Sequence, residues 1–155
     1  MTIRTEIFEI GFRWSWKASI SVEIECDTTA SLGLKRGLAV RAALKSRADL
    51  SDAVLSGADL RGADLRGADL WDCVANGAHM RTITTDIWTA TYTADVLQIG
   101  CQHHPITDWW AFEDQRIAEM AGQALEWWKR WKPILQNIIE AAPCEPTGAK
   151  QEEMK

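Results

Sequence analysis

The side chains best suited to chemistry gather in one short segment, residues 99–110, which reads IGCQHHPITDWW. The segment holds a thiol, two imidazoles, a carboxylate and two indoles: Cys101, His103, His104, Asp108, Trp109 and Trp110. These groups suit three kinds of site, namely a zinc ion, a cysteine nucleophile with a histidine base, or a loop that recognises a ligand by stacking and charge. A structural interpretation stays open beside them, in which the thiol and one imidazole are buried and the indoles anchor a helix.

The surrounding sequence favours recognition over catalysis. A zinc site needs a second Cys or His pair at ligand spacing, and the chain has none, so we expect no metal. Cys101 and His104 have the residue types of a nucleophile and its base, but no phosphate loop, dinucleotide fingerprint or nucleophile elbow accompanies them. We therefore expect neither an enzyme nor a cofactor. In a recognition loop, Trp109 or Trp110 would stack on a base, while His103, His104 and Arg81 address phosphates or ring edges.

A five-residue repeat fills the middle of the chain from Ala48 to Thr82. Its units read ADLSD, AVLSG, ADLRG, ADLRG, ADLWD, CVANG and AHMRT, with a small first residue and, in all but one, a larger apolar third residue. An α-helix would spread this pattern around its whole surface, and a β-strand would reverse it in alternate units. A chain that turns one corner per unit buries every third position, so we expect such a coil.

The consecutive units ADLRG, ADLRG and ADLWD resemble the pentapeptide-repeat family, whose members form a right-handed, four-sided β-helix with four units per coil. The resemblance implies a β-helix of under two coils. It places Asp59 below His79 and Arg61 below Arg81, as a basic column that could clamp a phosphate or carboxylate. Another wall would carry an acidic face of Asp49, Asp52, Asp69 and Asp72.

Residues before the repeat predict a β-hairpin and a helix. Apolar residues occupy the even positions from Phe8 to Cys26, which is typical of β-structure with one buried face, and a turn is expected near residues 13–17. Thr28, Thr29 and Ser31 offer N-caps for a helix that ends at Lys45. Its apolar face is expected to hold Leu34, Leu38, Val40 and Leu44. These elements would cover the open end of the coil.

Residues after the repeat predict strand to about Ile99 and helix from Asp108. The helical part divides into Glu113–Met120 and Gln123–Ala142, and Pro133 is expected to kink or divide the second segment. Its main apolar stripe holds Leu125, Trp128, Lys132, Leu135, Ile138 and Ile139. An adjoining face is predicted as a protein interface, which includes a homodimer through these helices, and consists of Trp127, Trp131 and Ile134.

The predicted fold class is mainly β with α, in a single domain over residues 1–142. It comprises a hairpin and helix over 1–45, a short right-handed quadrilateral β-helix with following strands over 46–99, and a Trp-rich helical cap over 100–142. Residues 143–155 are expected to be a disordered tail because they are rich in Pro, Gly, Glu and Lys.

Composition excludes several classes of partner. The 155 residues carry a net charge of −5, which disfavours duplex DNA because that binding depends on phosphate neutralisation. No apolar run reaches the length of a membrane span and no secretion signal begins the chain, so we expect no membrane partner and a cytosolic location. The four cysteines lie far apart without redox spacing, which indicates reduced thiols.

The whole layout is similar to small phage and prophage pentapeptide-repeat proteins, which implies a host cytosol and interference with a host process such as antiviral defence. We expect a non-catalytic protein that binds a small anionic or nucleotide ligand between the last turn of the repeat and the helical cap. The candidate ligand-binding residues are Arg61, His79, Arg81, Cys101, His103, His104 and Trp109. The alternative is a protein–protein inhibitor that presents the acidic face, in the manner of a DNA mimic, to a host nucleic-acid enzyme.

Overall fold

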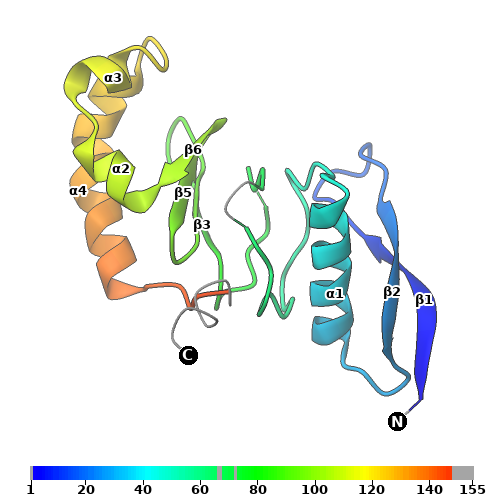
Figure 1. Ribbon diagram of the computed structural model, residues 1–155. Helices are drawn as coiled ribbons and strands as arrows, with labels where there is room; N and C mark the ends of the chain where they lie inside the picture. Colours follow the sequence, from blue (N-terminus) through cyan, green and yellow to red (C-terminus); the bar gives the residue numbers. More distant parts are fainter. Residues whose placement is uncertain (1, 66–67, 72, 148–155) are drawn as a thin grey trace.

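The computed structural model describes residues 2–65, 68–71 and 73–147. A hairpin and one helix form the N-terminal part, the five-residue repeat crosses the middle, and a second sheet with three helices forms the C-terminal part (Figure 1). The fold is therefore mixed β and α. No described helix has both the length and the apolar composition needed to cross a membrane.

The predicted hairpin is confirmed. Strands β1 (Ile3–Ile10) and β2 (Ile20–Asp27) pair antiparallel, and their even-numbered residues turn toward helix α1 (Leu32–Lys45). The loop at 11–19 is longer than the expected turn, and here the two indoles predicted on the buried face, Trp14 and Trp16, are 46% and 78% exposed. The alternation of faces depends on strand geometry, which ends at Ile10, so it does not govern the loop.

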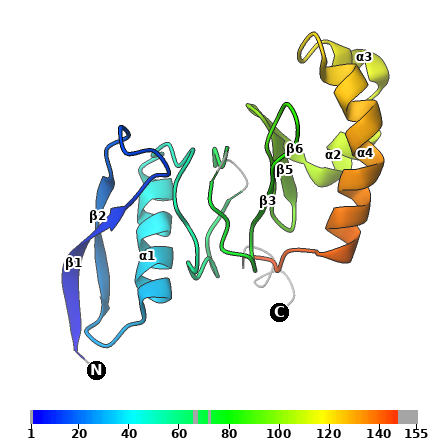
Figure 2. The same ribbon diagram turned by 180° about the vertical axis from the view of Figure 1, so that it is seen from behind.

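Helix α1 lies between the hairpin and the repeat in both views (Figures 1 and 2). Ser31 is its N-cap, because the Ser31 hydroxyl accepts a hydrogen bond from the Leu34 N–H at 3.2 Å. The expected apolar face is only partly right, since Leu34 is 38% exposed. The residues buried on α1 are mostly small, namely Gly37, Ala39, Val40 and Ala43, because the helix approaches the backbone of the repeat closely.

From Leu50 to Cys73, the repeat turns a corner every five residues, as predicted. The first residue of each of five units donates its N–H to the carbonyl of the third-position leucine before it, at 2.9–3.2 Å: Ala53 to Leu50, Ala58 to Leu55, Ala63 to Leu60, Ala68 to Leu65 and Cys73 to Leu70. Each of these leucines is 3% exposed or less. Positive φ angles recur with the same period at Arg47, Asp52, Gly57, Gly62 and Gly77. An α-helical interpretation of the repeat is therefore excluded.

Neighbouring turns of the repeat make contact at the expected offset. A parallel bridge joins Val54 to Val74, with the Leu55 N–H donating to the Val74 carbonyl at 3.0 Å. The hairpin extends this contact, because Phe12 forms an antiparallel bridge with Ala53. These bridges join parts of the turns only, and the described residues form no closed solenoid.

A second sheet follows the repeat in the order β3 (Arg81–Ile83), β4 (Ala90–Tyr92), β5 (Val96–Ile99) and β6 (Gln102–Pro105), all antiparallel. The strands expected up to about Ile99 are present as β3, β4 and β5, and turns divide the segment between them. At one turn the Thr93 hydroxyl accepts a hydrogen bond from the Val96 N–H at 3.1 Å. Strand β6 also falls within the segment expected to be a helical cap.

Three helices pack beside this sheet: α2 (Ile106–Ala111), α3 (Asp114–Ala118) and α4 (Ala124–Ala141) (Figure 1). Of the two outcomes expected at Pro133, a kink or a division of the last helix, the division does not occur, since α4 runs through the proline. Trp127, Trp128 and Leu135 are buried on either side of the proline, and their packing holds both halves of the helix in place.

The expected disordered tail is partly wrong. Cys144 is buried, and the Glu145 N–H donates to the Ala78 carbonyl at 2.9 Å. Residues 143–147 thus pack onto the end of the repeat, while residues 148–155 lie outside the described part of the chain.

Replacing Gly37 by alanine tests the close packing of α1. Alanine ordinarily favours a helix over glycine, but here its Cβ would stand 1.8 Å from the Asp59 carbonyl oxygen. We expect Gly37→Ala to lower the free energy of unfolding by about 1–3 kcal/mol in urea titration. Gly122→Ala is the matched control, because nothing lies within 4 Å of its added Cβ. A Gly37→Ala protein as stable as the wild type would contradict this packing.

Candidate functional site

In the chemistry-bearing segment after β5, the Trp109 indole is not available for the stacking that a recognition loop needs. Trp109 is 2% exposed, its Nε1 donates to the Leu97 carbonyl at 2.6 Å, and its ring lies 5.3 Å from that of Trp128. A ligand cannot stack on an indole that is already enclosed by protein. The structural interpretation of the indole therefore holds, and Trp109 joins helix α2 to the second sheet.

Cys101 and His104 do not face one another as nucleophile and base. Gln102 lies between them, with its Nε2 4.0 Å from the Cys101 Sγ and its Oε1 3.3 Å from the His104 Nε2. The His104 ring packs edge-on to Trp109 and Phe112, and burial lowers its pKa, helped by Arg116 and His103. His103 is exposed. Within the described residues, no three His, Cys, Asp or Glu side chains gather closely enough to hold a metal ion.

The four thiols differ sharply in their surroundings. Cys101 is exposed, whereas Cys26, Cys73 and Cys144 are buried. Burial raises the pKa of Cys73 to about 12, and its Sγ lies 2.8 Å from the Leu50 carbonyl oxygen. Burial likewise raises the pKa of Cys144.

We expect a thiol reagent such as Ellman's reagent to titrate one cysteine rapidly in the folded protein and the other three only on unfolding. The fast thiol is Cys101, so Cys101→Ser should abolish the fast phase and leave the slow phase unchanged. Rapid modification of a second thiol in the folded protein would contradict the burial described here.

The predicted basic column separates into different environments. Arg61 binds Asp59 through two hydrogen bonds, from Nε to Oδ1 at 2.8 Å and from a terminal nitrogen to Oδ2 at 2.5 Å. His79 is buried, with its Nδ1 3.2 Å from the Glu145 carbonyl oxygen. Arg81 lies in β3 beside Cys144, whose pKa it affects. Arg61 is thus engaged by Asp59, whereas Arg81 lies beside Cys144, and the clamp between the two arginines stays a prediction.

The Arg61 guanidinium holds the pKa of Asp59 at about 2, and the charge of His79 adds to the effect. The ion pair therefore stabilises the fold above the ordinary carboxyl pKa, and this contribution disappears as the pH falls toward 2.

We expect Arg61→Gln to raise the pKa of Asp59 by about 1 or more, as measured by carboxyl carbon NMR during an acid titration. The acid limb of the unfolding curve should begin at a higher pH in this variant. An unchanged Asp59 pKa would show that the guanidinium is not its main partner.

The predicted acidic face is largely occupied by internal partners. Asp52 is 6% exposed and accepts a hydrogen bond from the Trp14 Nε1 at 3.2 Å. Asp49 accepts from the Ser51 N–H and lies 3.7 Å from the Lys17 ammonium. Asp69 accepts from the Gln98 Nε2 at 2.7 Å. Asp72 lies outside the described residues.

The predicted interface on α4 is also mostly internal. Trp127 is 3% exposed, and its Nε1 donates to the Thr85 hydroxyl at 3.2 Å. Trp131 is half-buried and donates from its Nε1 to Asp86 at 2.9 Å. Ile134 is 40% exposed. Burial on two sides explains why apolar residues surround so much of this helix.

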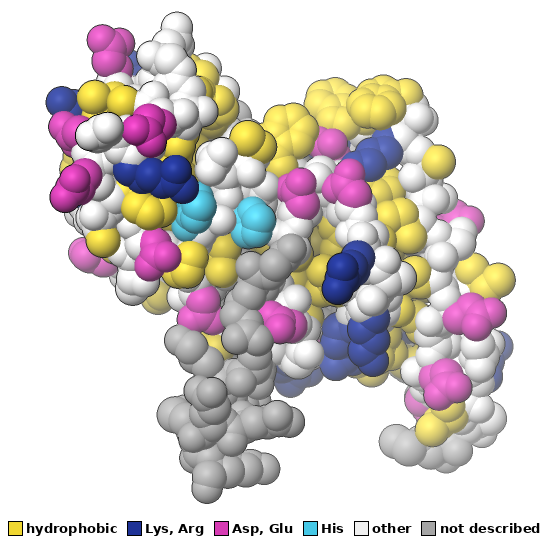
Figure 3. Space-filling view, turned by 45° about the horizontal axis from the view of Figure 1, so that its top comes forward, with side chains coloured by type: hydrophobic (Ala, Val, Ile, Leu, Met, Phe, Trp, Pro, Cys, Tyr) yellow, Lys and Arg dark blue, Asp and Glu magenta, His cyan; other side chains and the backbone are white. Residues whose placement is uncertain are grey.

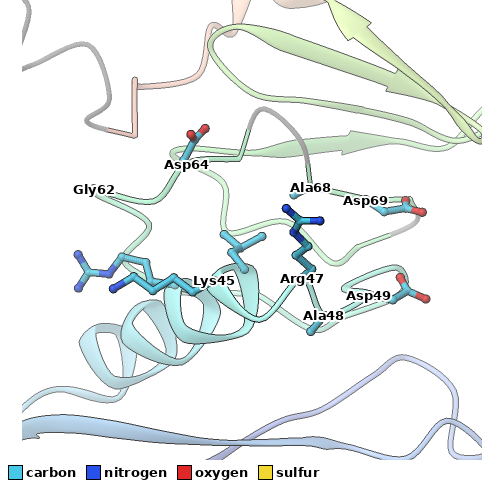
Figure 4. Close-up of a pocket in the computed structure, with 10 residues that line it drawn as sticks. Lys45, Arg47, Ala48, Asp49, Gly62, Asp64, Ala68 and Asp69 are labelled. Carbon is cyan, nitrogen blue, oxygen red and sulfur yellow. The ribbon is translucent and has the colours of Figure 1, made fainter.

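A pocket that the sequence analysis did not predict lies between the end of α1 and the repeat (Figure 4). Its volume is about 670 Å³. It is lined by Arg41, Leu44, Lys45, Arg47, Ala48, Asp49, Gly62, Asp64, Ala68 and Asp69, and we call it the α1 pocket. In the space-filling view, Lys and Arg side chains gather over this part of the molecule (Figure 3).

In the α1 pocket, two carboxylates have partners within the protein, whereas two of the cationic side chains have no ion-pair partner among the described residues. Asp49 and Asp69 have the internal partners described above, and Figure 4 shows both carboxylates directed together, away from Lys45. Arg47 extends from the end of α1 toward Ala68. Among the described residues, neither Lys45 nor Arg47 has a carboxylate within ion-pair distance.

These cations are not needed to complete the helix. A C-terminal helix end normally attracts cations through its unpaired carbonyls. Here the Ser46 hydroxyl bonds the carbonyls of Ala42 and Ala43, and the Arg47 N–H donates to the Leu44 carbonyl at 3.0 Å. Since local groups satisfy the helix end, the Lys45 and Arg47 side chains remain available to another anion.

One sequence signal could have indicated this site. Arg41 and Lys45 are four residues apart and so share a helix face. Their proximity to Arg47 and to the repeat depends on how α1 packs, which the spacing alone does not reveal.

Comparison with known proteins identifies the middle of the chain. Residues 46–81 match the family model of pentapeptide repeats, in 8 copies. These pentapeptide repeats thus begin two residues before the first unit recognised in the sequence, and they include Arg47 at the wall of the α1 pocket. No curated protein and no solved structure matches the chain.

Proposed function

We propose that this protein is a non-catalytic binding protein for a small anionic ligand, held in the α1 pocket by Arg41, Lys45 and Arg47. The observation that carries the proposal is that acidic side chains of the pocket have partners within the protein, whereas two of its basic side chains have none among the described residues. The carboxylates of Asp49 and Asp69 are engaged by neighbouring groups, while Lys45 and Arg47 lack such partners among the described residues. An entering anion would therefore meet available positive charge.

The pocket suits a phosphate-bearing molecule. Sites for small molecules commonly span about 300–1,000 Å³, and this pocket of about 670 Å³ falls within that range. A guanidinium can bind phosphate or carboxylate through two parallel hydrogen bonds, and an ammonium adds a compact charge. Arg41 commits one nitrogen to the Arg61 carbonyl at 3.2 Å, which holds its side chain against the repeat. A nucleotide satisfies this chemistry.

We further propose that the pentapeptide repeats form a right-handed, four-sided β-helix. The recurrent corners and the parallel bridge between Val54 and Val74 support this. The likeness to phage pentapeptide-repeat proteins supports a role in the host cytosol, where sequestering or sensing an anionic messenger would interfere with a host process.

A protein–protein inhibitor remains the second candidate. The exposed Asp69 and Trp71 favour it, because they could contact another protein. It has less support, since Asp52 is enclosed and Asp49 lies beside Lys17.

Thermal-shift measurements with inorganic phosphate, nucleoside phosphates and cyclic nucleotides test the proposal. A ligand at a hundred times its Kd stabilises the fold by about 2.7 kcal/mol, so we expect a rise in Tm with at least one of these probes. Lys45→Glu should weaken that binding at least about tenfold because it replaces attraction by repulsion.

Lys129→Glu is the matched control, because Lys129 is an exposed lysine on α4 away from the pocket. Its affinity for the probe should equal that of the wild type. If none of the probes raises the Tm, or if Lys45→Glu binds as the wild type does, the anion-binding proposal fails.

A further inference from the structure

Strand β1 forms an edge of the two-stranded sheet at the outer end of the molecule (Figures 1 and 2). In the register of β1 and β2, the numbers of two opposed residues add up to 30, as in the pair Arg4 and Cys26. Thr2 and Thr28 continue this register, and the Thr28 N–H donates a hydrogen bond to the Thr2 carbonyl, so Thr2 faces β2. The even residues of β1 therefore bond to β2. The N–H and C=O groups of Ile3, Thr5 and Ile7 point to the opposite edge.

That opposite edge meets the repeat only beyond the strand. The Arg13 N–H donates to the Asp52 carbonyl, and the Val54 N–H donates to the Gly11 carbonyl, both at 2.9 Å. Within the described part of the chain, no strand pairs with the edge over residues 3–9. An edge strand of this kind is a template for another strand.

The side chains along this edge are unusually apolar for an exposed surface. Ile3 is 67% exposed and Ile7 is 71% exposed, and they flank Thr5 on the outer face of the hairpin. Strand β1 contains neither lysine nor proline, the residues that commonly block pairing at an edge. The edge is therefore open to pairing both through its backbone and through its side chains.

The charge pattern of β1 is complementary to that of a second β1 strand paired with it in antiparallel orientation. Centred on Thr5, an antiparallel pair of β1 strands places Arg4 opposite Glu6 and Ile3 opposite Ile7, twice each. A register centred on Glu6 would place the two Glu6 carboxylates opposite each other, and one centred on Arg4 would do the same with the two guanidiniums. Centring on Ile7 would set Arg4 opposite Ile10 and lose the charge pairs. The backbone permits all four registers, so the side chains decide among them.

We propose that β1 pairs with β1 of a second copy of this chain, antiparallel and centred on Thr5, to form a four-stranded sheet across the dimer. Glu6 is held in place by the Lys35 ammonium at 2.9 Å and by Arg4 of its own chain at 3.2 Å. Its carboxylate is thus positioned to accept Arg4 of the second copy as well. This dimer is independent of the α1 pocket and of the predicted contact through α4.

Light scattering with size-exclusion chromatography tests the association. We expect a mass that rises with concentration toward twice the monomer's 17.4 kDa. Ile7→Lys should return the protein to monomer, because it places a charge in the apolar contact between Ile7 and Ile3 of the second copy. Ile87→Lys is the control, since Ile87 is 45% exposed on the loop between β3 and β4 and should leave the dimer intact.

Disulfide trapping tests the register, in a Cys101→Ser background that removes the exposed thiol. Thr5→Cys should cross-link with itself, because opposed residues of a hydrogen-bonded pair have Cα atoms about 5.5 Å apart, within disulfide reach. Ile7→Cys should not, since its copies would lie about 14 Å apart. Circular dichroism confirms that each variant is folded. A monomer at every concentration, or cross-linking of Ile7→Cys in preference to Thr5→Cys, would overturn the proposal.

Discussion

The repeat buries one leucine in every five residues, and this burial shapes both the helix that packs on the repeat and the sheet that follows it. Each described corner returns a first-position N–H to the carbonyl of the leucine before it, so the chain changes direction while its apolar side chain stays inside. A residue with positive φ completes the corner, and glycine or aspartate accommodates that conformation at small cost. The repeat therefore presents a backbone wall rather than a layer of large side chains.

That wall determines how the N-terminal part attaches. A helix can approach a bare backbone closely only where its own side chains are small, and Gly33 and Gly37 provide such positions on α1. Arg36 then reaches the Ser56 carbonyl and Arg41 the Arg61 carbonyl, so the helix is also hydrogen-bonded to the repeat. The same packing leaves the C-terminal end of the helix over the repeat and creates the α1 pocket.

The C-terminal part is built on a different principle, the burial of indole rings. Trp109, Trp127 and Trp128 form one cluster with the second sheet, and two of their Nε1 groups find internal acceptors. The residues that looked most like a recognition site thus stabilise the fold. Cys101 and His103 stay exposed at the surface beside them.

The elements that follow from a short repeat period could be predicted from the amino-acid sequence. A period of five residues predicts the corners of the repeat, a period of two predicts the hairpin, and a period of 3.6 predicts the limits of α1 and α4. Each period assigns side chains to a buried or an exposed side. The sequence could not determine where turns at Thr93 and at Gly100, which has a positive φ angle, divide a β-rich segment, nor that α4 would continue through Pro133.

Which functional groups meet depends on contacts between segments that lie far apart along the chain. Arg61 binds Asp59, which lies two residues before it in the chain. The repeat spacing had instead placed Arg61 in one column with Arg81. Lys45 and Arg47 line the α1 pocket because α1 packs on the repeat, which is a contact between segments separated along the chain. Local spacing encodes direction and burial, but the partner of a charged side chain depends on packing across the whole molecule.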